Sequence, residues 1–120
     1  MVDEGTLATT AQVLLAIGQD GNATQILEAN TNIWILYAES ELEMETDGKG
    51  LVVNYASITA TYKQWLASVA AARAAWHAIN QDQNNWDLAT TQSKLNVLDS
   101  IYQAGVENLR KEDVIARMGL

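Results

Sequence analysis

Hydrophobic residues recur along most of this chain at steps of three and four, which is the period of an α-helix. The first such segment begins after Thr9 or Thr10, either of which can cap it, and Gly18 is expected to end it in a left-handed conformation. A longer helix is predicted over residues 22–45, because a capping-box pattern opens it. Its predicted buried stripe comprises Ile26, Ile33, Tyr37 and Met44, flanked by Leu27, Trp34, Ala38 and Leu42.

The clearest helical pattern follows a break at residues 46–50 and a short extended or docking segment at residues 51–53. Ser57 is expected to cap this helix, which is predicted to end near Asn80. One continuous hydrophobic face runs along it, formed by Ile58, Tyr62, Trp65, Val69, Ala72, Trp76 and Ile79. Alanines fill much of its middle, so a neighbouring helix can approach closely.

A last long helix is predicted over residues 90–109, after a polar stretch at residues 81–85. Its hydrophobic stripe consists of Leu95, Leu98, Tyr102 and either Val106 or Leu109. The pattern therefore predicts an all-α bundle of about four helices over residues 1–110, with a C-terminal extension at residues 111–120. That extension is expected to be a short helix or a docking tail, because no position in the bundle pattern requires its hydrophobic side chains.

The size and composition agree with one globular domain. The chain has 120 residues, of which 48% are hydrophobic, and it contains no cysteine, which excludes disulfides and a thiol nucleophile. No basic region followed by a hydrophobic run opens the chain, and no hydrophobic stretch approaches the roughly 20 residues of a membrane span. These features predict an intracellular product, made in the cytoplasm.

The charge is strongly negative and unevenly distributed. Residues 1–60 carry nine acidic residues and one lysine, a balance of −8, whereas residues 61–120 carry six acidic and six basic residues. This distribution argues against a protein that grips nucleic acid, because phosphate binding requires clustered Lys and Arg. It suits a surface that repels DNA or docks onto something basic. An acidic face kept for solubility is the plainer alternative.

Acidic residues occupy every second position of the stretch AESELEMETDG, namely Glu39, Glu41, Glu43, Glu45 and Asp47. On a helix, residues two apart point about 200° from each other, so Glu39 and Glu43 share one side while Glu41 and Glu45 share another. Like charges four residues apart cost a few tenths of a kcal/mol, and these lie at the unfavourable end of the helix dipole. We therefore expect these acids to face solvent or a channel, and replacing Glu41 and Glu45 with Gln should raise the melting temperature or leave it unchanged.

Candidate chemistry is sparse. A di-metal carboxylate site requires Glu-x-x-His pairs, which do not occur, so no metal is expected. His77 has no catalytic partner in its sequence surroundings and is expected to be a packed or surface residue, so no catalytic residue and no cofactor are predicted. A small all-α enzyme would need a pocket lined with cations, and the helical stripes place only Lys63 and Arg73 nearby. Three tryptophans lie on core stripes, whereas Trp86 is expected to dock onto a partner or onto the bundle.

Residues 20–48 also carry a pattern found in one family of viral proteins. The positions are Asp20, Ile26, Leu27, Ile33, Ala38, Leu42, Glu43, Thr46, Asp47 and Gly48. This pattern resembles the N-terminal part of phage head-to-tail adaptor (connector) proteins, in which an acidic loop precedes a hydrophobic helix ending in a threonine and a glycine. Here Asp47 stands between that threonine and that glycine. The resemblance covers about a quarter of the chain.

The resemblance implies a non-enzymatic helical bundle that forms a homo-oligomeric ring beneath the portal, at the head-tail junction of the virion. It implies a portal protein and a tail or stopper protein as partners, and a channel through which DNA passes without specific binding. A C-terminal segment commonly clasps the portal in such proteins. The residues expected to dock are Arg110, Lys111, Val114, Ile115, Arg117, Met118 and Leu120. The alternatives are a virion decoration protein, a helical-bundle regulator and a small all-α enzyme.

Overall fold

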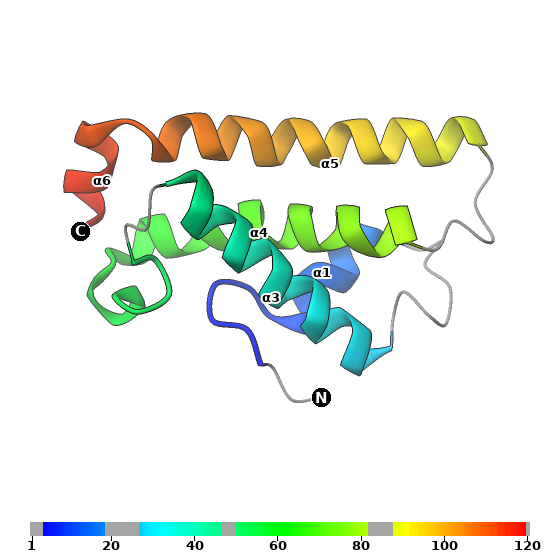
Figure 1. The fold of residues 1–120 in the computed structure, drawn as a ribbon, viewed down its shortest axis with the longest axis horizontal. Coiled ribbons are helices and arrows are strands. Elements are labelled where there is room, and N and C mark those ends of the chain that lie inside the picture. The colour runs from blue at the N-terminus through cyan, green and yellow to red at the C-terminus, as the bar shows by residue number, and fades with distance from the viewer. Residues whose placement is uncertain (1–3, 19–26, 47–49, 82–87, 120) are drawn as a thin grey trace.

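The protein is an all-α bundle in which four helices surround a shared core (Figure 1). The structure, a computed structural model, describes residues 4–18, 27–46, 50–81 and 88–119, and these contain no strand. The helices are α1 (Thr10–Ile17), α3 (Glu28–Glu45), α4 (Ala60–Gln81), α5 (Leu88–Leu109) and the short α6 (Glu112–Met118), with one 3₁₀ turn at Tyr55–Ser57. The predicted fold class is confirmed.

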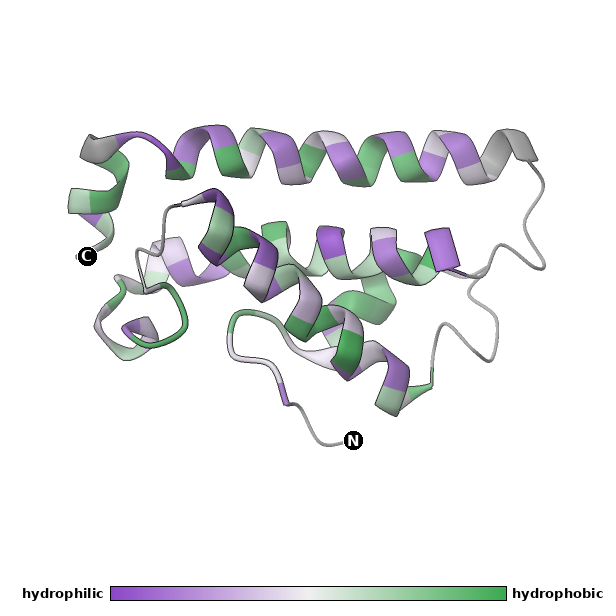
Figure 2. Cartoon of the chain, viewed as in Figure 1, coloured by the Kyte–Doolittle hydropathy of each residue, from purple (hydrophilic) through white to green (hydrophobic). Residues whose placement is uncertain are grey.

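Helix α4 is the centre of the bundle, because α1, α3 and α5 all pack against it. Its buried side chains are Leu66, Ala67, Val69, Ala70, Ala71, Ala72, Ala74, Ala75, Ala78 and Ile79. Figure 2 shows hydrophobic and hydrophilic residues along both α4 and α5, as expected for helices with one buried side. The alanines leave room for close approach, and α5 approaches α4 closely at Gly105. A Cβ there would lie 2.5 Å from Cγ2 of Val69.

The boundaries of α1 agree with the prediction in detail. Thr9 caps the helix, and a capping box joins Thr9 to Gln12: the Gln12 amide donates to the Thr9 hydroxyl at 3.2 Å, and the Thr9 amide donates to Gln12 Oε1 at 2.8 Å. Gly18 ends the helix with φ at 91° and ψ at −171°. The positive φ that favours glycine is therefore present, although this ψ lies outside the left-handed helical region.

Helix α3 is rotated relative to the prediction. The central positions of the expected stripe are wrong, since Ile33, Tyr37 and Met44 are exposed, whereas the flanking Ala38 and Leu42 are buried as predicted. The buried positions are instead Thr31, Asn32, Ile35, Ala38, Glu39, Leu42 and Thr46. These residues are mostly three or four positions apart, so they lie on one face of the helix. Because several of them are polar, hydrophobic periodicity alone does not identify that face as buried. The predicted start at Asn22 and the stripe residue Ile26 lie outside the described residues.

The described part of the connection from α3 to α4, residues 50–59, forms a series of turns. Leu51 is fully buried and Val53 is largely exposed, so the segment expected to be extended forms turns around one buried leucine. The capping position predicted at Ser57 is wrong, because Ser57 belongs to the 3₁₀ turn and α4 begins at Ala60. Local hydrogen bonds hold this turn, including one of 3.1 Å from the Ile58 amide to the Tyr55 carbonyl oxygen.

The C-terminal segment belongs to the core, contrary to the expectation of a separate docking tail at residues 111–120. The stripe of α5 is buried as predicted at Leu98, Tyr102, Val106 and Leu109. Beyond it, α6 turns back onto the bundle, and the Thr59 amide donates to the Met118 carbonyl oxygen at 3.1 Å. Met118 is fully buried and Ile115 nearly so. The physical reason is that α6 is amphipathic and covers the end of the core between α4 and α5.

Candidate functional site

The four described glutamates of the acidic run each bind a different part of the chain. Glu39 and Glu43 project toward the N-terminal segment and the loop after α3. Glu41 and Glu45 project toward α4 and the end of α5. The division into two sides follows from the helical geometry, as predicted. The expected solvent or channel face is wrong for Glu39, which is buried. Glu41 and Glu43 are partly buried and Glu45 is substantially exposed, although each carboxylate has a partner within the subunit, and Asp47 lies outside the described residues.

Glu39 anchors the segment that precedes α1. Its side chain is only 5% exposed, and Oε1 accepts a hydrogen bond of 2.9 Å from the Leu7 amide. The same carboxylate accepts from the Thr6 amide. A buried carboxylate requires such donors, because burial without them costs several kcal/mol. Glu39 therefore holds Leu7 in the core, where it is buried with Val13 and Ile17.

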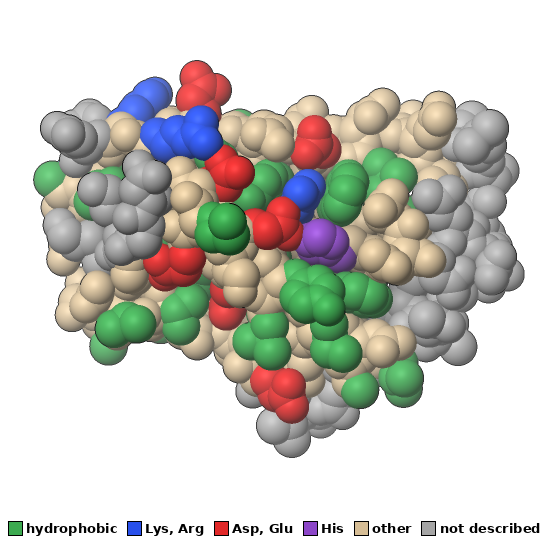
Figure 3. Space-filling model, viewed as in Figure 1, with side chains coloured by type: hydrophobic (Ala, Val, Ile, Leu, Met, Phe, Trp, Pro, Cys, Tyr) green, Lys and Arg blue, Asp and Glu red, His purple; other side chains and the backbone are tan. Residues whose placement is uncertain are grey.

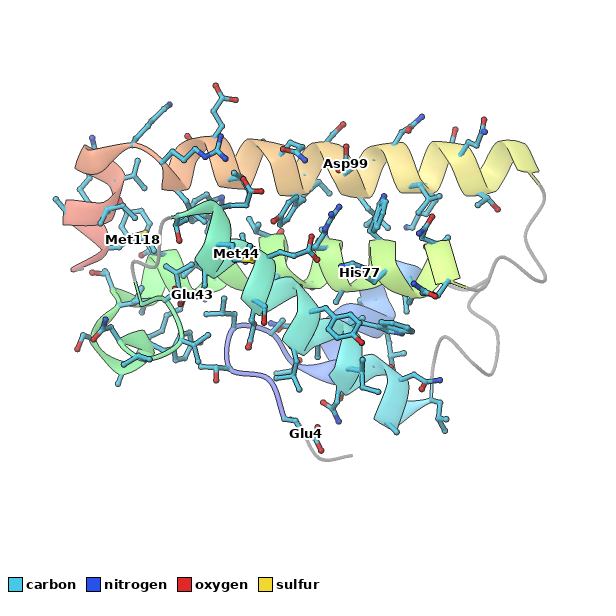
Figure 4. The ribbon with its side chains drawn as sticks, viewed as in Figure 1. Glu4, Glu43, Met44, His77, Asp99 and Met118 are labelled. Carbon is cyan, nitrogen blue, oxygen red and sulfur yellow. The ribbon has the colours of Figure 1, made fainter. Side chains whose placement is uncertain are left out.

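Glu41 connects α3 to α4 through two basic residues of α4, Arg73 and His77. Figure 4 labels His77 on α4 and Asp99 on α5. Glu41 Oε2 accepts from Arg73 Nε at 2.8 Å and lies 2.7 Å from Arg73 Nη2, which makes a two-pronged ion pair. Its Oε1 is hydrogen-bonded to Nε2 of His77, one helical turn further along α4. The other side of the guanidinium lies 3.5 Å from Asp99 of α5. This cluster therefore joins all three long helices.

Aromatic rings surround the cluster. His77 is stacked on Trp34, with ring centroids 6.4 Å apart and planes inclined by 17°. Tyr37 and Trp76 approach the imidazole edge-on at 5.8 Å and 5.3 Å. The guanidinium carbon of Arg73 lies 4.2 Å from the Trp76 ring centroid and 4.5 Å from that of Tyr102. These rings shield the ion pair from water and add cation–π attraction to it.

The surroundings change the acidity of two groups. Burial acts to raise the pKa of Glu41, but hydrogen bonds from Arg73 and His77, with their charges, outweigh it and lower that pKa below its usual value of 4.5. Burial, followed by the nearby charge of Glu41, raises the pKa of Tyr102 to about 12. Glu41 is therefore ionised, and Tyr102 neutral, over the physiological range.

Glu43 and Glu45 complete the set at the end of α3. Glu43 accepts from the Gly50 amide at 3.1 Å and from the Val52 amide at 3.0 Å, so it fixes the turn that leads to α4. Glu45 pairs with Arg110 at the end of α5, and Arg110 Nε also donates to the Glu45 carbonyl oxygen at 3.2 Å. Both residues of this last pair are substantially exposed, so it contributes little to stability.

The arrangement supports helix packing better than catalysis. A histidine held by a carboxylate is one part of a general-base system, which also needs a nucleophile or substrate at the other ring nitrogen. Here the described neighbours of the imidazole are the aromatic rings. A shallow hollow of about 660 Å³ lies beside the cluster, lined by Arg73, Trp76, Gln92, Leu95, Asn96 and Asp99. In the described part of the chain, no group of three or more His, Cys, Asp and Glu residues is placed to hold a metal ion.

The residues predicted to dock onto a portal are split between core and surface. Ile115 and Met118 are buried, so their predicted docking role is wrong. Arg110 is exposed and paired with Glu45, and Lys111 is exposed with its Nζ 3.3 Å from Asn108 Oδ1. Val114 and Arg117 line a hollow of about 280 Å³ beside α6, together with Thr61, Tyr62, Trp65 and Asn108. Leu120 and Trp86 lie outside the described residues.

Two surfaces expose hydrophobic side chains that the sequence pattern did not predict to be exposed. The α3 ridge consists of Ile33, Leu36, Tyr37 and Met44, which share one face of that helix. Figure 3 shows hydrophobic side chains gathered over α3 beside His77. The α1–α5 groove is a hollow of about 360 Å³ lined by Gln12, Leu15, Ala16, Gln64, Ala67, Ser68, Ala71, Ala72, Lys94, Val97, Leu98 and Ile101. Such surfaces are typical of protein contacts.

Comparison with known proteins does not add to this picture. Within the described residues, no helix combines the length and the hydrophobicity that crossing a membrane requires. Comparisons of the chain with protein-family models, with curated proteins and with solved structures give no significant match.

Proposed function

We propose that this protein is a non-enzymatic structural subunit, specifically a head-to-tail adaptor of a tailed phage that forms a ring beneath the portal. The observation that carries the proposal is a division of roles among the side chains. The central polar residues Glu41, Arg73 and His77 bind one another and so join α3 to α4. The α3 ridge and the α1–α5 groove, in contrast, expose hydrophobic side chains on the surface. A subunit that is built for contacts with other proteins has this distribution.

The phage assignment rests on the resemblance of residues 20–48 and on the charge. A net charge of −8 with seven basic residues suits a protein that lets DNA pass without gripping it. The acidic run itself no longer supports a channel lining, because Glu39, Glu41 and Glu43 hold other segments of the subunit. The proposal therefore relies on overall charge and not on that run.

The portal would meet the subunit at the end where α6 packs. Arg110 and Lys111 are exposed there, just before α6 in the sequence. Two residues of α6, Val114 and Arg117, line the hollow of about 280 Å³. In this form of the proposal α6 is a folded part of the docking surface and not a tail that becomes ordered on binding. Docking then costs less conformational entropy than the folding of a free tail would.

Imaging the purified protein alone and with the portal protein of its virus tests the proposal. A ring of subunits on the portal, coaxial with its channel, is the expected result. The alternative functions predict other outcomes: a decoration protein would bind the head shell, and a helical-bundle regulator would remain a monomer or dimer. Failure to bind the portal in any oligomeric state would refute the adaptor role.

A further inference from the structure

The α3 ridge and the α1–α5 groove lie on opposite sides of the bundle. Arg73 and His77 mark the face of α4 that contacts α3, and Ser68 and Ala71 mark the face that lines the groove. At about 100° per residue, Ala71 lies about 200° around the helix from Arg73. One side of the molecule therefore carries a convex hydrophobic surface, and the other carries a concave one.

The groove is long enough to receive part of the ridge. Ile33 and Met44 are eleven positions apart along α3, which corresponds to about 16 Å. The wall of the groove on α5, from Lys94 to Ile101, corresponds to about 10 Å. The groove can therefore receive about two turns of the ridge, which is enough for Ile33, Leu36 and Tyr37. An amphipathic helix seated in a hydrophobic groove is a common mode of protein recognition.

Charge favours contact of the ridge with the groove over contact of two ridges. Lys94 is the one ionisable residue among those that line the groove. Acidic side chains flank the ridge: Glu43 lies beside it on α3, and Glu4 lies at the first turns of the helix, where its amide donates to Asn32 Oδ1 at 3.0 Å. Two ridges in contact would place these acids together, whereas the groove would bring them toward Lys94.

We infer that the α3 ridge of one copy packs into the α1–α5 groove of the next copy. This contact joins different surfaces of identical chains, so it leaves one ridge and one groove unused in every dimer. Such a contact produces a closed ring or an open filament, according to the rotation between neighbours. The inference deepens the proposed function and rests on it for the closed ring. It assigns the residues that hold neighbouring subunits together.

Two substitutions disable one surface each. Leu36→Glu places a charge on the ridge, Val97→Glu places one in the groove, and Val53→Glu is the control because Val53 is exposed and belongs to neither surface. Sedimentation velocity over a range of concentrations measures the assembly. The wild type and the control should form oligomers larger than a dimer, and each of the other variants should associate roughly tenfold or more weakly. Lys94→Glu should weaken association, whereas Lys94→Arg should preserve it.

Mixing the two variants gives the decisive result. Leu36→Glu retains its groove and Val97→Glu retains its ridge, so an equal mixture should form one-to-one dimers that grow no further. Contact between two ridges would instead leave Val97→Glu as well associated as the wild type, and this outcome would overturn the inference. A wild type that remains monomeric, or a mixture that forms no dimer, would also overturn it.

Two further variants protect the test against misfolding. Tyr37→Glu on the ridge and Leu15→Glu in the groove alter side chains that are 52% and 82% exposed, and circular dichroism establishes that each variant is folded. Portal binding then separates this inference from the proposed function. Self-association through these surfaces without portal binding would refute the adaptor role alone. Normal rings on the portal formed by Leu36→Glu and by Val97→Glu would refute the inference alone.

Discussion

Glu41 on α3 binds Arg73 on α4 through two guanidinium nitrogens, at 2.8 Å from Nε and 2.7 Å from Nη2. The pair lies 32 positions apart in the sequence and is enclosed by aromatic rings. The acidic run of α3 is thus a set of attachments between segments, and Glu41 is the attachment at the centre of the bundle. This changes the expected effect of neutralising it.

Replacing Glu41 with Gln should destabilise the protein by about 1–3 kcal/mol, because Arg73 and His77 lose a charged acceptor in a partly buried place. Glu45→Gln is the matched control on the same helix, since its partner Arg110 is exposed and such pairs contribute about 0–1 kcal/mol. Urea unfolding measures both changes. Equal effects of the two substitutions would contradict the central role of Glu41.

Stability should fall on acidification in a way that depends on Glu41. Because the pKa of Glu41 is lowered in the folded state, its contribution is complete above its ordinary pKa of 4.5. That contribution is lost as the pH falls below this value and through the lower pKa of the folded state. Unfolding free energies of the wild type and Glu41→Gln should therefore converge as the pH decreases. A constant difference down to strongly acidic pH would be inconsistent with this pKa.

Ionisation of Tyr102 should lower the free energy of unfolding at alkaline pH. Its pKa is raised from 10.0 to about 12, so its stabilising effect is complete below pH 10 and is lost as the pH rises toward 12. The ultraviolet absorbance of phenolate should report one tyrosine that titrates near pH 12. Tyr102→Phe should remove this late titration and reduce the alkaline loss of stability. An unchanged titration curve in that variant would assign the late group to another tyrosine.

The Met118 side chain should contribute to the stability of the fold as a core residue does. Met118→Ala is expected to cost about 2–5 kcal/mol, because it leaves a cavity under α6 where the side chain is fully buried. Lys111→Ala, at the exposed start of the same segment, should change the stability by no more than about 0.5 kcal/mol. Thermal unfolding distinguishes the two. Truncation after Arg110 should likewise destabilise the bundle, and a truncated chain as stable as the wild type would make α6 dispensable.

Gly105→Ala should destabilise the protein even though alanine is the better helix former. The gain in helix propensity is about 1 kcal/mol, but the new Cβ would lie 2.5 Å and 2.7 Å from the two methyl carbons of Val69. Val69→Ala removes those methyl groups, so the double variant should be more stable than the sum of the two single effects predicts. Additive effects would show that α5 can shift away from α4 without cost.

The periodic pattern of the sequence determined much of the local structure. The boundaries of α1 between Thr9 and Gly18 and the buried stripe of α5 follow from residues close together in the chain. The alanine-rich middle of α4 likewise predicted a helix that packs closely against its neighbours. Caps and hydrophobic periodicity depend on local geometry, and for that reason the sequence alone reveals them.

Tertiary structure decided which face of α3 is buried and what its glutamates do. The partners of Glu41 and Glu45 lie 32 to 65 positions away, and a carboxylate that meets its donors inside the fold is indistinguishable in sequence from one that faces water. Glu39 shows this most clearly, because its burial depends on the Thr6 and Leu7 amides reaching it. A polar group is stable in the core only when distant segments supply its hydrogen bonds, and only the assembled bundle brings those segments together.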